Sequence, residues 1–170
     1  MNQRICYCLM PSPLGNVLLV ANGDALCGAY FDDQKYLPPI DAAWQEDNSS
    51  AVLRAAHAQL DQYFAGSRKR FELPLAPNGT SFQRAVWNAI AQVPWGETLA
   101  YAELASRAGR PGSARAAGAA TGRNPLSIIV PCHRIVGSDG SLTGYAGGLD
   151  RKQKLLALER PLFALERQAA

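Results

Sequence analysis

Cysteine, net charge and long apolar runs are all scarce in this sequence. Its 170 residues include four cysteines, and their spacing is not that of a disulfide scaffold. No apolar stretch is long enough to span a bilayer, and no signal-peptide pattern is found. These absences argue against a disulfide-stapled secreted protein and against a membrane protein. We therefore expect a cytoplasmic chain without a membrane partner, in which the thiols stay reduced.

Three of the cysteines and one histidine could be imagined as a zinc-binding set, namely Cys6, Cys8, Cys27 and His57. Only one residue separates Cys6 from Cys8, however, whereas zinc-binding pairs usually have two to four between them. Alternation along a strand would also place both sulfurs on the same face. The spacing favours core cysteines, so we expect no metal and no cofactor.

The chain divides by pattern into two parts, which we expect to be separate domains. Residues 1–75 contain short segments of strand-like alternation separated by tight turns, followed by an amphipathic helix over 51–65. Residues 80–165 have mainly helical patterns, beginning with a capping-box signature at Thr80 and Gln83. The expected fold class is α/β, more narrowly α+β. A small N-terminal antiparallel sheet with a covering helix is followed by a mostly helical C-terminal domain.

The most informative segment is the apolar run at 128–136, because it contains a cysteine and a histidine side by side, Cys132 and His133. Thiolate is the nucleophilic form of cysteine, and imidazole is one of the few groups that can accept its proton near neutral pH. Pro131 fixes its own φ and favours an extended Val130, so we expect a strand that ends at Val130 and a bend at Cys132. This bend would bring the sulfur to the lip of a pocket. The alternative is a buried structural cysteine beside a surface histidine.

A histidine that acts as a base needs a third group to fix its tautomer, and Glu159 is the candidate. Residues 150–159 have the pattern of a helix in which Arg151, Lys152 and Lys154 are exposed and the leucines are buried. Glu159 follows two of these leucines by three and four residues, which places its carboxylate on the buried face. Helix geometry alone leaves a second interpretation open, in which Glu159 is solvated at a frayed helix end.

A helix-turn-helix pattern lies upstream of the cysteine. Residues 101–108 and 114–121 are two short helical patterns joined by a tight turn. Apart from Arg115 and Thr121, the second helix consists of alanine and glycine, whereas major-groove readers normally present several polar side chains. We therefore expect this helix to enter the minor groove without reading sequence, with Arg115 filling the gap left by an extruded nucleotide. The alternative is a tightly packed core helix with Arg115 at its exposed end.

Positive charge is concentrated near the helix-turn-helix. Residues 101–136 contain five arginines and one acidic residue, a net charge of +4, whereas residues 1–60 contain three basic and six acidic residues, a net charge of −3. The overall charge of +3 hides this asymmetry. A modest basic patch of this kind suits DNA phosphates and predicts a moderate, salt-sensitive affinity.

Four elements in order resemble the O6-alkylguanine-DNA alkyltransferases, also called methylated-DNA-protein-cysteine methyltransferases. They are 115–118 (Arg-Ala-Ala-Gly), 124–125 (Asn-Pro), 131–134 (Pro-Cys-His-Arg) and 145–149 (Tyr-Ala-Gly-Gly-Leu). The resemblance is strong from about residue 80 to 159. It is weaker before that, where 12–15 is similar to the family's first hairpin. It implies that residues 80–165 bind DNA and carry the alkyl acceptor, and that residues 1–75 form a structural domain.

The resemblance implies a chemical role for five matched residues. Cys132 is the implied alkyl acceptor, His133 takes the thiol proton through a water, and Glu159 orients His133. Tyr101 donates a proton to the departing guanine ring, which makes guanine a better leaving group. Asn124 matches the hinge between the recognition helix and the active-site segment.

The resemblance also implies which residues contact DNA and the flipped base. Arg115 matches the family's intercalating finger, and the glycine-rich segment 145–148 matches the lid over the base. The expected DNA-contacting residues are Arg110, Ala114, Arg115, Ala116, Gly118, Ala119, Thr121 and Arg123. The expected base-pocket and lid residues are Val130, Pro131, Ile135, Tyr145, Ala146 and Gly147.

The implied activity is a direct and irreversible transfer of the alkyl group of O6-alkylguanine to Cys132, after the base is flipped out through the minor groove. O4-alkylthymine is left open as a second substrate. A thioether has no easy return path, so each molecule acts once. The implied partner is double-stranded DNA that contains O6-alkylguanine, and we expect a monomer in solution, with clustering on DNA left open. Two alternatives remain: a non-enzymatic protein that binds alkylated DNA, and a hydrolase that uses Cys132, His133 and Glu159.

Overall fold

The structure is a computed structural model that describes residues 4–160. The chain forms two compact units, the first made of residues 1–78 with 125–127 and the second of 79–124 with 128–170. Residues 161–165, the end of the expected second domain, lie outside the described residues. Between Asn124 and Ile128 the chain passes through the first unit, where Leu126 pairs with Ala29.

The first unit is built on a four-stranded sheet with the strand order β3, β2, β1, β4. β1 (Ile5–Met10), β2 (Val17–Asn22) and β3 (Ala25–Phe31) are antiparallel neighbours, as the alternation predicts. β4 (Gln45–Glu46) pairs in parallel with β1, so the expectation of a purely antiparallel sheet is wrong at this edge. Two exposed polar residues are too short a segment to show a strand period.

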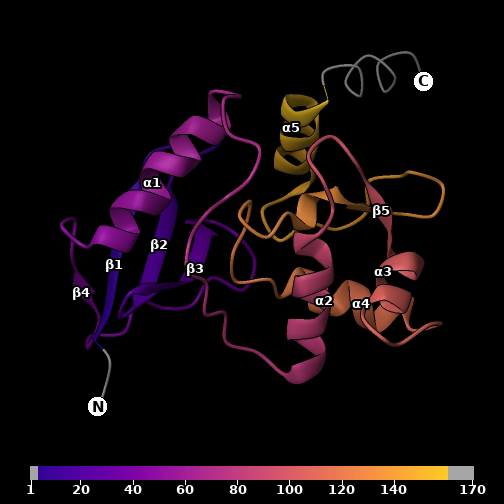
Figure 1. The fold of residues 1–170 in the computed structure, drawn as a ribbon, viewed down its shortest axis with the longest axis horizontal. Coiled ribbons are helices and arrows are strands. Elements are labelled where there is room, and N and C mark those ends of the chain that lie inside the picture. The colour runs from indigo at the N-terminus through magenta and orange to yellow at the C-terminus, as the bar shows by residue number, and fades with distance from the viewer. Residues whose placement is uncertain (1–3, 161–170) are drawn as a thin grey trace. The chain divides into compact units, whose positions relative to one another are not determined.

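One helix, α1 (Ala51–Phe64), packs against the strands of the first unit and lies along the sheet in Figure 1. Its apolar stripe predicts that the side chains of Leu53, Ala56, Leu60, Tyr63 and Phe64 face inward. The first four are fully buried, and Phe64 is half-buried. The expected covering helix is therefore confirmed.

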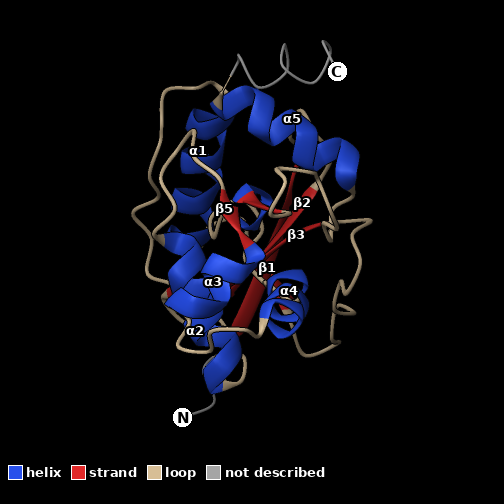
Figure 2. Cartoon of the chain, turned by 90° about the vertical axis from the view of Figure 1, so that its right-hand side faces the viewer, coloured by secondary structure: helices blue, strands red, loops and turns tan. Residues whose placement is uncertain are grey.

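The second unit is mostly helical, as Figure 2 shows. Three of its helices pack against one another, namely α2 (Ser81–Ala91), α3 (Tyr101–Arg107) and α4 (Ala114–Gly122). A short parallel pair, β5 (Leu99–Ala100) and β6 (Ile135–Val136), and α5 (Leu149–Glu159) complete it. Within the part of the chain that the structure describes, no helix has the length and apolar character needed to cross a membrane.

The start of α2 confirms the expected capping box. The Thr80 hydroxyl accepts a hydrogen bond from the Gln83 backbone N–H at 3.2 Å, and the Thr80 N–H donates to Gln83 Oε1 at 2.9 Å. This reciprocal pair satisfies two backbone groups that a helix start leaves without partners. Between the two helices of the helix-turn-helix, Ser113 directly precedes α4, where its residue type predicts a cap. Its side chain makes no capping hydrogen bond, so that prediction is wrong.

Candidate active site

The segment before Cys132 is a series of turns and not the strand that its apolar residues predict. Ile128, in the middle of these turns, has a φ of 72°, which is unusual for a β-branched residue. Buried apolar turns and buried strands have the same composition, so the strand prediction was wrong. The predicted bend at Cys132 is confirmed, because residues Cys132–Arg134 form one turn of 3-10 helix, η1, which leads into β6.

The sulfur of Cys132 is enclosed, with only 4% of the residue exposed. The expected position at the lip of an open pocket is therefore wrong for the structure as it stands. Burial raises the pKa of the Cys132 thiol, while hydrogen bonds from the Asn124 side chain and from the backbone of Cys132 and His133, together with the charge of Lys152, act in the opposite direction. Asn124 is fixed in turn by a 2.8 Å bond from its Nδ2 to the Val130 carbonyl.

The imidazole of His133 is bound to the carboxylate of Glu159. His133 Nε2 lies 2.6 Å from Glu159 Oε1, and both side chains have no exposed surface. The expected inward position of Glu159 is confirmed, and the alternative of a solvated, frayed helix end is wrong. Because Nε2 is used in this bond, Nδ1 is the ring nitrogen left to accept another proton.

Arg134 binds the same carboxylate, a contact that the sequence did not predict. Its Nε lies 2.8 Å from Glu159 Oε2 and its Nη2 lies 2.9 Å from Oε1, while Nη1 donates to the Val93 carbonyl at 2.6 Å. Burial tends to raise the pKa of Glu159, but the hydrogen bonds and charges of His133 and Arg134 outweigh it and lower that pKa to about 2. Burial also lowers the pKa of His133. The group therefore holds an ionised carboxylate and a neutral imidazole at pH 7.

Lys152 was expected on the exposed face of α5, and this expectation is wrong. The residue is fully buried, and its Nζ donates to the carbonyls of Ile135, Thr143 (2.9 Å) and Gly144 (3.1 Å). Burial lowers the pKa of Lys152 to about 8, although Cys132 acts to raise it. The ammonium group of Lys152 thus connects α5 by hydrogen bonds to β6 and to residues 143–144, which directly precede the glycine-rich segment 145–148.

Tyr101 lies beside this ammonium group at the start of α3. Its hydroxyl donates to the Thr143 carbonyl at 3.1 Å, and Lys152 Nζ is 5.9 Å from the centre of its ring. Burial raises the pKa of Tyr101, although the bond to Thr143 lowers it, so the phenol keeps its proton at pH 7. The structure therefore brings Tyr101 to the segment that directly precedes the expected lid, 145–148.

The expected base-pocket and lid residues are largely enclosed. Val130, Pro131, Ile135 and Gly147 are buried, while Tyr145 and Ala146 are partly exposed. The turn of the loop is closed by a hydrogen bond from Gly148 N–H to the Tyr145 carbonyl at 2.9 Å. Four of these six residues are thus buried, so most of the expected base pocket is closed to solvent in this structure.

The second helix of the helix-turn-helix, α4, is half in the core. Arg115, Ala116 and Ala119 are exposed, Ala114 and Gly118 are partly exposed, and Ala117, Ala120 and Thr121 are buried. Thr121 Oγ1 donates to the Ala117 carbonyl at 2.7 Å, so the expected surface position of Thr121 is wrong. One face of α4 is therefore packed in the core, as in the core-helix interpretation. The other face, with Arg115, is exposed, as the DNA-binding interpretation requires.

The remaining two expected DNA-contacting arginines, Arg110 and Arg123, are exposed. The guanidinium of Arg110 stacks on the ring of Phe82 at 4.5 Å, which fixes its direction. The indole of Trp87 in α2 donates to the Ala120 carbonyl at 2.8 Å and thereby fixes α4 against α2.

The N-terminal cysteines are not clustered with other residues that could bind a metal ion. Among residues 4–160, no group of three or more His, Cys, Asp or Glu side chains is placed to hold a metal ion. Cys6 and Cys8 are buried, and burial raises the pKa of the Cys8 thiol to about 11, so it does not supply a thiolate at pH 7.

Comparison with known proteins agrees with this geometry over nearly the whole chain. Residues 5–77 match the family model described as the ribonuclease-like domain of 6-O-methylguanine DNA methyltransferase. Residues 81–161 match the model described as its DNA binding domain.

Relatives with the same name occur in archaea and bacteria. A methylated-DNA--protein-cysteine methyltransferase of Methanosarcina acetivorans is 46% identical over 153 residues, which are 90% of this chain and 97% of the relative. The protein of that name from Mycolicibacterium paratuberculosis is 46% identical over 154 residues, covering 91% and 92% of the two chains. The crystal structure of Mycobacterium tuberculosis OGT in complex with DNA matches with a TM-score of 0.86 and 44% identity, covering 91% of this chain and 92% of that one. The chain therefore belongs to the methylated-DNA-protein-cysteine methyltransferase family.

Proposed function

We propose that this protein repairs DNA by moving the alkyl group of an O6-alkylguanine onto the sulfur of its own Cys132. The observation that carries the proposal is the enclosed sulfur of Cys132 next to the 2.6 Å pair of His133 and Glu159, in a unit that also exposes Arg115 on α4. The relatives are named for this reaction, and the Mycobacterium tuberculosis structure contains DNA. The protein is thus a methylated-DNA-protein-cysteine S-methyltransferase that acts once.

The chemistry assigned to Cys132 and His133 is a single displacement. The Cys132 thiol gives its proton to Nδ1 of His133 by way of a water, because Nε2 already bonds to Glu159. The thiolate attacks the alkyl carbon, an S–C bond forms and the C–O6 bond breaks. The ionised Glu159 stabilises the imidazolium that results. Amide donors from Asn124 and the backbone of η1 stabilise the thiolate before attack.

The leaving group is assigned to Tyr101. Its phenol keeps its proton at pH 7 and can give it to the guanine, which then leaves as a neutral base. The proton held on His133 returns to the phenolate through solvent, so that the reaction moves one proton from the thiol to guanine overall. Lys152, 5.9 Å from the ring of Tyr101, stabilises the transient phenolate.

DNA access is assigned to α4. A base inside a duplex must be turned out before its O6 substituent can meet Cys132. The exposed face of α4 has alanines beside Arg115 and so allows close approach to the minor groove, where Arg115 replaces the flipped base. Because Cys132 is 4% exposed, entry of the base also requires the loop 145–148 to move.

A transfer assay separates this function from its two alternatives. A duplex with a labelled O6-methyl group is incubated with the protein, and label on the protein is measured against protein added. Transfer of about one label per molecule that disappears in Cys132→Ala supports the proposal. Tight binding of the duplex without transfer supports a non-enzymatic binding protein instead. Repeated turnover of an ester that depends on Cys132, His133 and Glu159 supports a hydrolase.

We also place the protein in the cytoplasm as a monomer. The acceptor sulfur must be reduced to act, and all four cysteines are free thiols. O4-alkylthymine would offer the same leaving-group chemistry, and the same label assay with that lesion tests it.

A further inference from the structure

The loop that follows α1 carries three consecutive basic residues, Arg68, Lys69 and Arg70. Residues 1–78 contain six basic and eight acidic residues, a net charge of −2, and half of the basic ones are in this triplet. Like charges side by side repel one another, so a net acidic unit gains nothing in stability from collecting its cations in one place. The function assigned to Cys132 and α4 makes no use of this triplet.

The loop is held firmly at both ends by α1. At its start, the Ser67 and Arg68 N–H groups donate to the Gln62 carbonyl at 3.0 and 3.2 Å. At its end, Glu72 N–H donates to Gln59 Oε1 at 2.8 Å, and Gln59 Nε2 donates back to the Glu72 carbonyl at 3.0 Å. A loop fixed in this way does not have to order its backbone on binding, which lowers the entropic cost.

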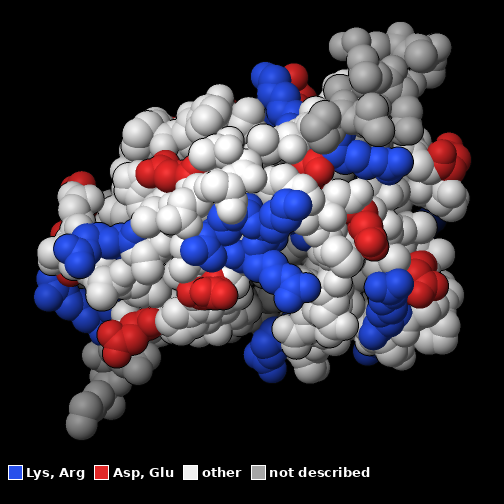
Figure 3. All heavy atoms as spheres, turned by 45° about the horizontal axis from the view of Figure 1, so that its top comes forward, with Lys and Arg blue, Asp and Glu red and all other residues white. Residues whose placement is uncertain are grey.

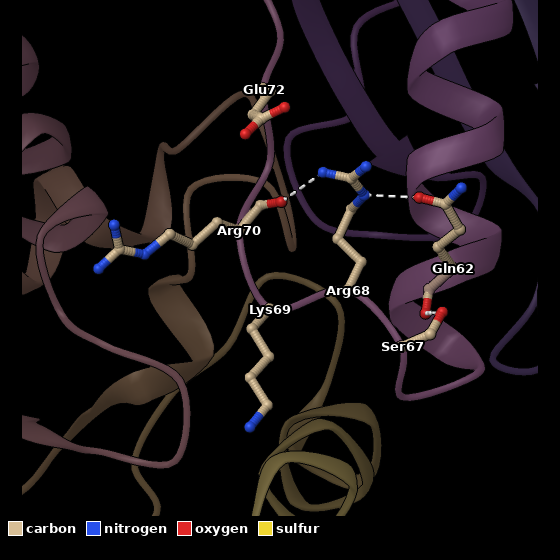
Figure 4. Close-up of a pocket in the computed structure, with 6 residues that line it drawn as sticks. All are labelled: Gln62, Ser67, Arg68, Lys69, Arg70 and Glu72. Carbon is tan, nitrogen blue, oxygen red and sulfur yellow. Dashed lines mark hydrogen bonds between the residues drawn. The ribbon is translucent and has the colours of Figure 1, made fainter.

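Arg68 is fixed within this loop as well. Its Nε donates to Gln62 Oε1 at 2.7 Å and its Nη1 donates to the Arg70 carbonyl at 2.9 Å, as Figure 4 shows. Arg68, Lys69 and Arg70 have no carboxylate partner among residues 4–160. They line an open hollow of about 540 Å³ together with Gln62, Ser67 and Glu72.

The three side chains point in different directions from the loop (Figure 4). A pocket for one small anion would need them to converge on a point, as several donors do around a bound phosphate. Divergent cations instead suit an extended polyanion, in which successive charges are spaced along a backbone. Interaction with the dipole of α1 does not explain the triplet, because one cation near the last turn of the helix is enough for it.

On the face shown in Figure 3, isolated acidic side chains lie among basic ones, and in one area several Lys and Arg side chains adjoin one another. We propose that Arg68, Lys69 and Arg70 form a second nucleic-acid contact, separate from α4, that binds the phosphate backbone of duplex DNA without reading its sequence. The proposal rests on the DNA repair function above and extends it by giving the N-terminal unit a role in DNA binding. The phosphates belong either to the duplex that carries the lesion or to a second duplex.

The salt dependence of binding tests the contact. Affinity for an unmodified duplex of about 30 base pairs is measured at several salt concentrations for the full chain, for Arg68→Gln/Lys69→Gln/Arg70→Gln, and for Lys69→Gln/Arg70→Gln. Each lost phosphate contact reduces the slope of log Kobs against log salt by about 0.9. Between 50 and 200 mM salt, the wild type should therefore lose about 40-fold more affinity than the triple variant and about 12-fold more than the double variant. The double variant leaves the hydrogen bonds of Arg68 in place, so it guards against a loss of fold.

A charge-matched control removes the other three cations of the same unit, as Arg4→Gln/Lys35→Gln/Arg54→Gln. This variant has the same net charge as the first triple variant and should keep the wild-type slope. Equal slopes for the wild type and the loop variants, or equal reductions in the loop and control variants, overturn the proposal. Binding of an acidic protein by the loop with no change in the DNA slope overturns it as well.

Two further arms identify the source of the phosphates and separate this inference from the proposed function. A slope difference that is present with about 30 base pairs and absent with a duplex of about 10, one helical turn, assigns the contact to the same duplex. Loss of a second bound duplex in sedimentation of the loop variants assigns it to another molecule.

Label transfer from an O6-methylguanine duplex is measured alongside. If the wild type itself neither binds nor transfers, the proposed function fails, whereas normal transfer with unchanged slopes rejects only the loop contact.

Discussion

His133 Nε2 and Glu159 Oε1 lie 2.6 Å apart with no exposed surface on either side chain. The residues are 26 positions apart, one in η1 and the other at the end of α5. Their contact closes the active-site segment against the last described helix. In the proposed mechanism, Nδ1 of His133 is the acceptor for the thiol proton, because Nε2 takes part in this contact.

Glu159→Gln is expected to slow alkyl transfer and to destabilise the fold. Loss of the carboxylate removes the anion that stabilises the imidazolium and leaves the guanidinium of Arg134 buried without its partner. Single-turnover reaction with free O6-benzylguanine should slow roughly 100-fold or more. The free energy of unfolding should fall by about 3 kcal/mol or more. Glu103→Gln, which breaks the exposed pair with Arg107, is the control and should cost less than about 1 kcal/mol. Equal losses in the two variants would contradict the structural account of Glu159.

Acid should destabilise the protein through both members of this pair. The folded-state pKa of His133 is below its ordinary 6.5, so the unfolded chain binds more protons and stability declines as the pH falls below 6.5. Glu159 has a pKa of about 2 in the folded state against an ordinary value of 4.5. Its contribution is therefore complete above pH 4.5 and is lost as the pH falls towards 2.

Urea unfolding between pH 7.5 and 4 measures this dependence. His133→Gln should remove the decline that begins near pH 6.5, whereas His57→Gln, at a partly exposed position on α1, should keep it. A pH dependence in His133→Gln that matches the wild type would show that the decline has another origin.

Lys152→Met should loosen the loop that follows β6. The methionine keeps most of the side-chain volume but removes the donor shared by the carbonyls of Ile135, Thr143 and Gly144. Leaving the buried Ile135 carbonyl without a donor costs about 1–3 kcal/mol. Hydrogen exchange at residues 143–148 should become faster, and transfer from O6-benzylguanine slower. Lys154→Met, which affects only an exposed pair with Asp150, should leave both unchanged. An unchanged rate of hydrogen exchange at residues 143–148 in Lys152→Met would show that Lys152 does not hold this loop in place.

Arg115→Ala should separate repair in duplex DNA from reaction with a free base. The guanidinium is needed only to replace the flipped base, so reaction with free O6-benzylguanine should keep the wild-type rate. Repair of O6-methylguanine in a duplex should fall roughly 10-fold or more, since a few kcal/mol of unstacking are no longer compensated. Arg54→Ala removes an exposed arginine from α1 and should affect neither reaction. If both reactions fall equally in Arg115→Ala, the intercalating role is wrong.

The spacing along α5 shows how far the sequence could predict this site. Three- and four-residue spacing places Glu159 on the same face as Leu155 and Leu156, and the structure confirms it. The same spacing places Lys152 on that face, three residues before Leu155 and seven before Glu159. Its charge led to the opposite prediction, because an isolated lysine is seldom buried. Only the positions of three carbonyls outside α5, which accept hydrogen bonds from its ammonium group, explain why it is buried here.

Other misses have a similar origin. Arg134 follows His133 directly and has no periodic signal, and its partners Glu159 and Val93 come from other elements of the same unit. The buried position of Thr121 was missed although the sequence contains a signal for it. Thr121 follows Ala117 by four residues, so helical spacing places both on the same face, and both are buried. The turns before Cys132 could not be found in this way, because an apolar composition does not distinguish a buried turn from a buried strand.

Under the proposed function each molecule reacts once, so the low exposure of Cys132 affects how often the protein is consumed without repairing DNA. Any electrophile dissolved in the cell that reached this sulfur first would consume the molecule without repairing anything. A thiol with 4% exposure and a raised pKa reacts slowly with such reagents. Burial of the sulfur therefore contributes to selectivity for DNA damage. The thiol is shielded from reagents in bulk solution and reacts only with a group that enters the site when it opens.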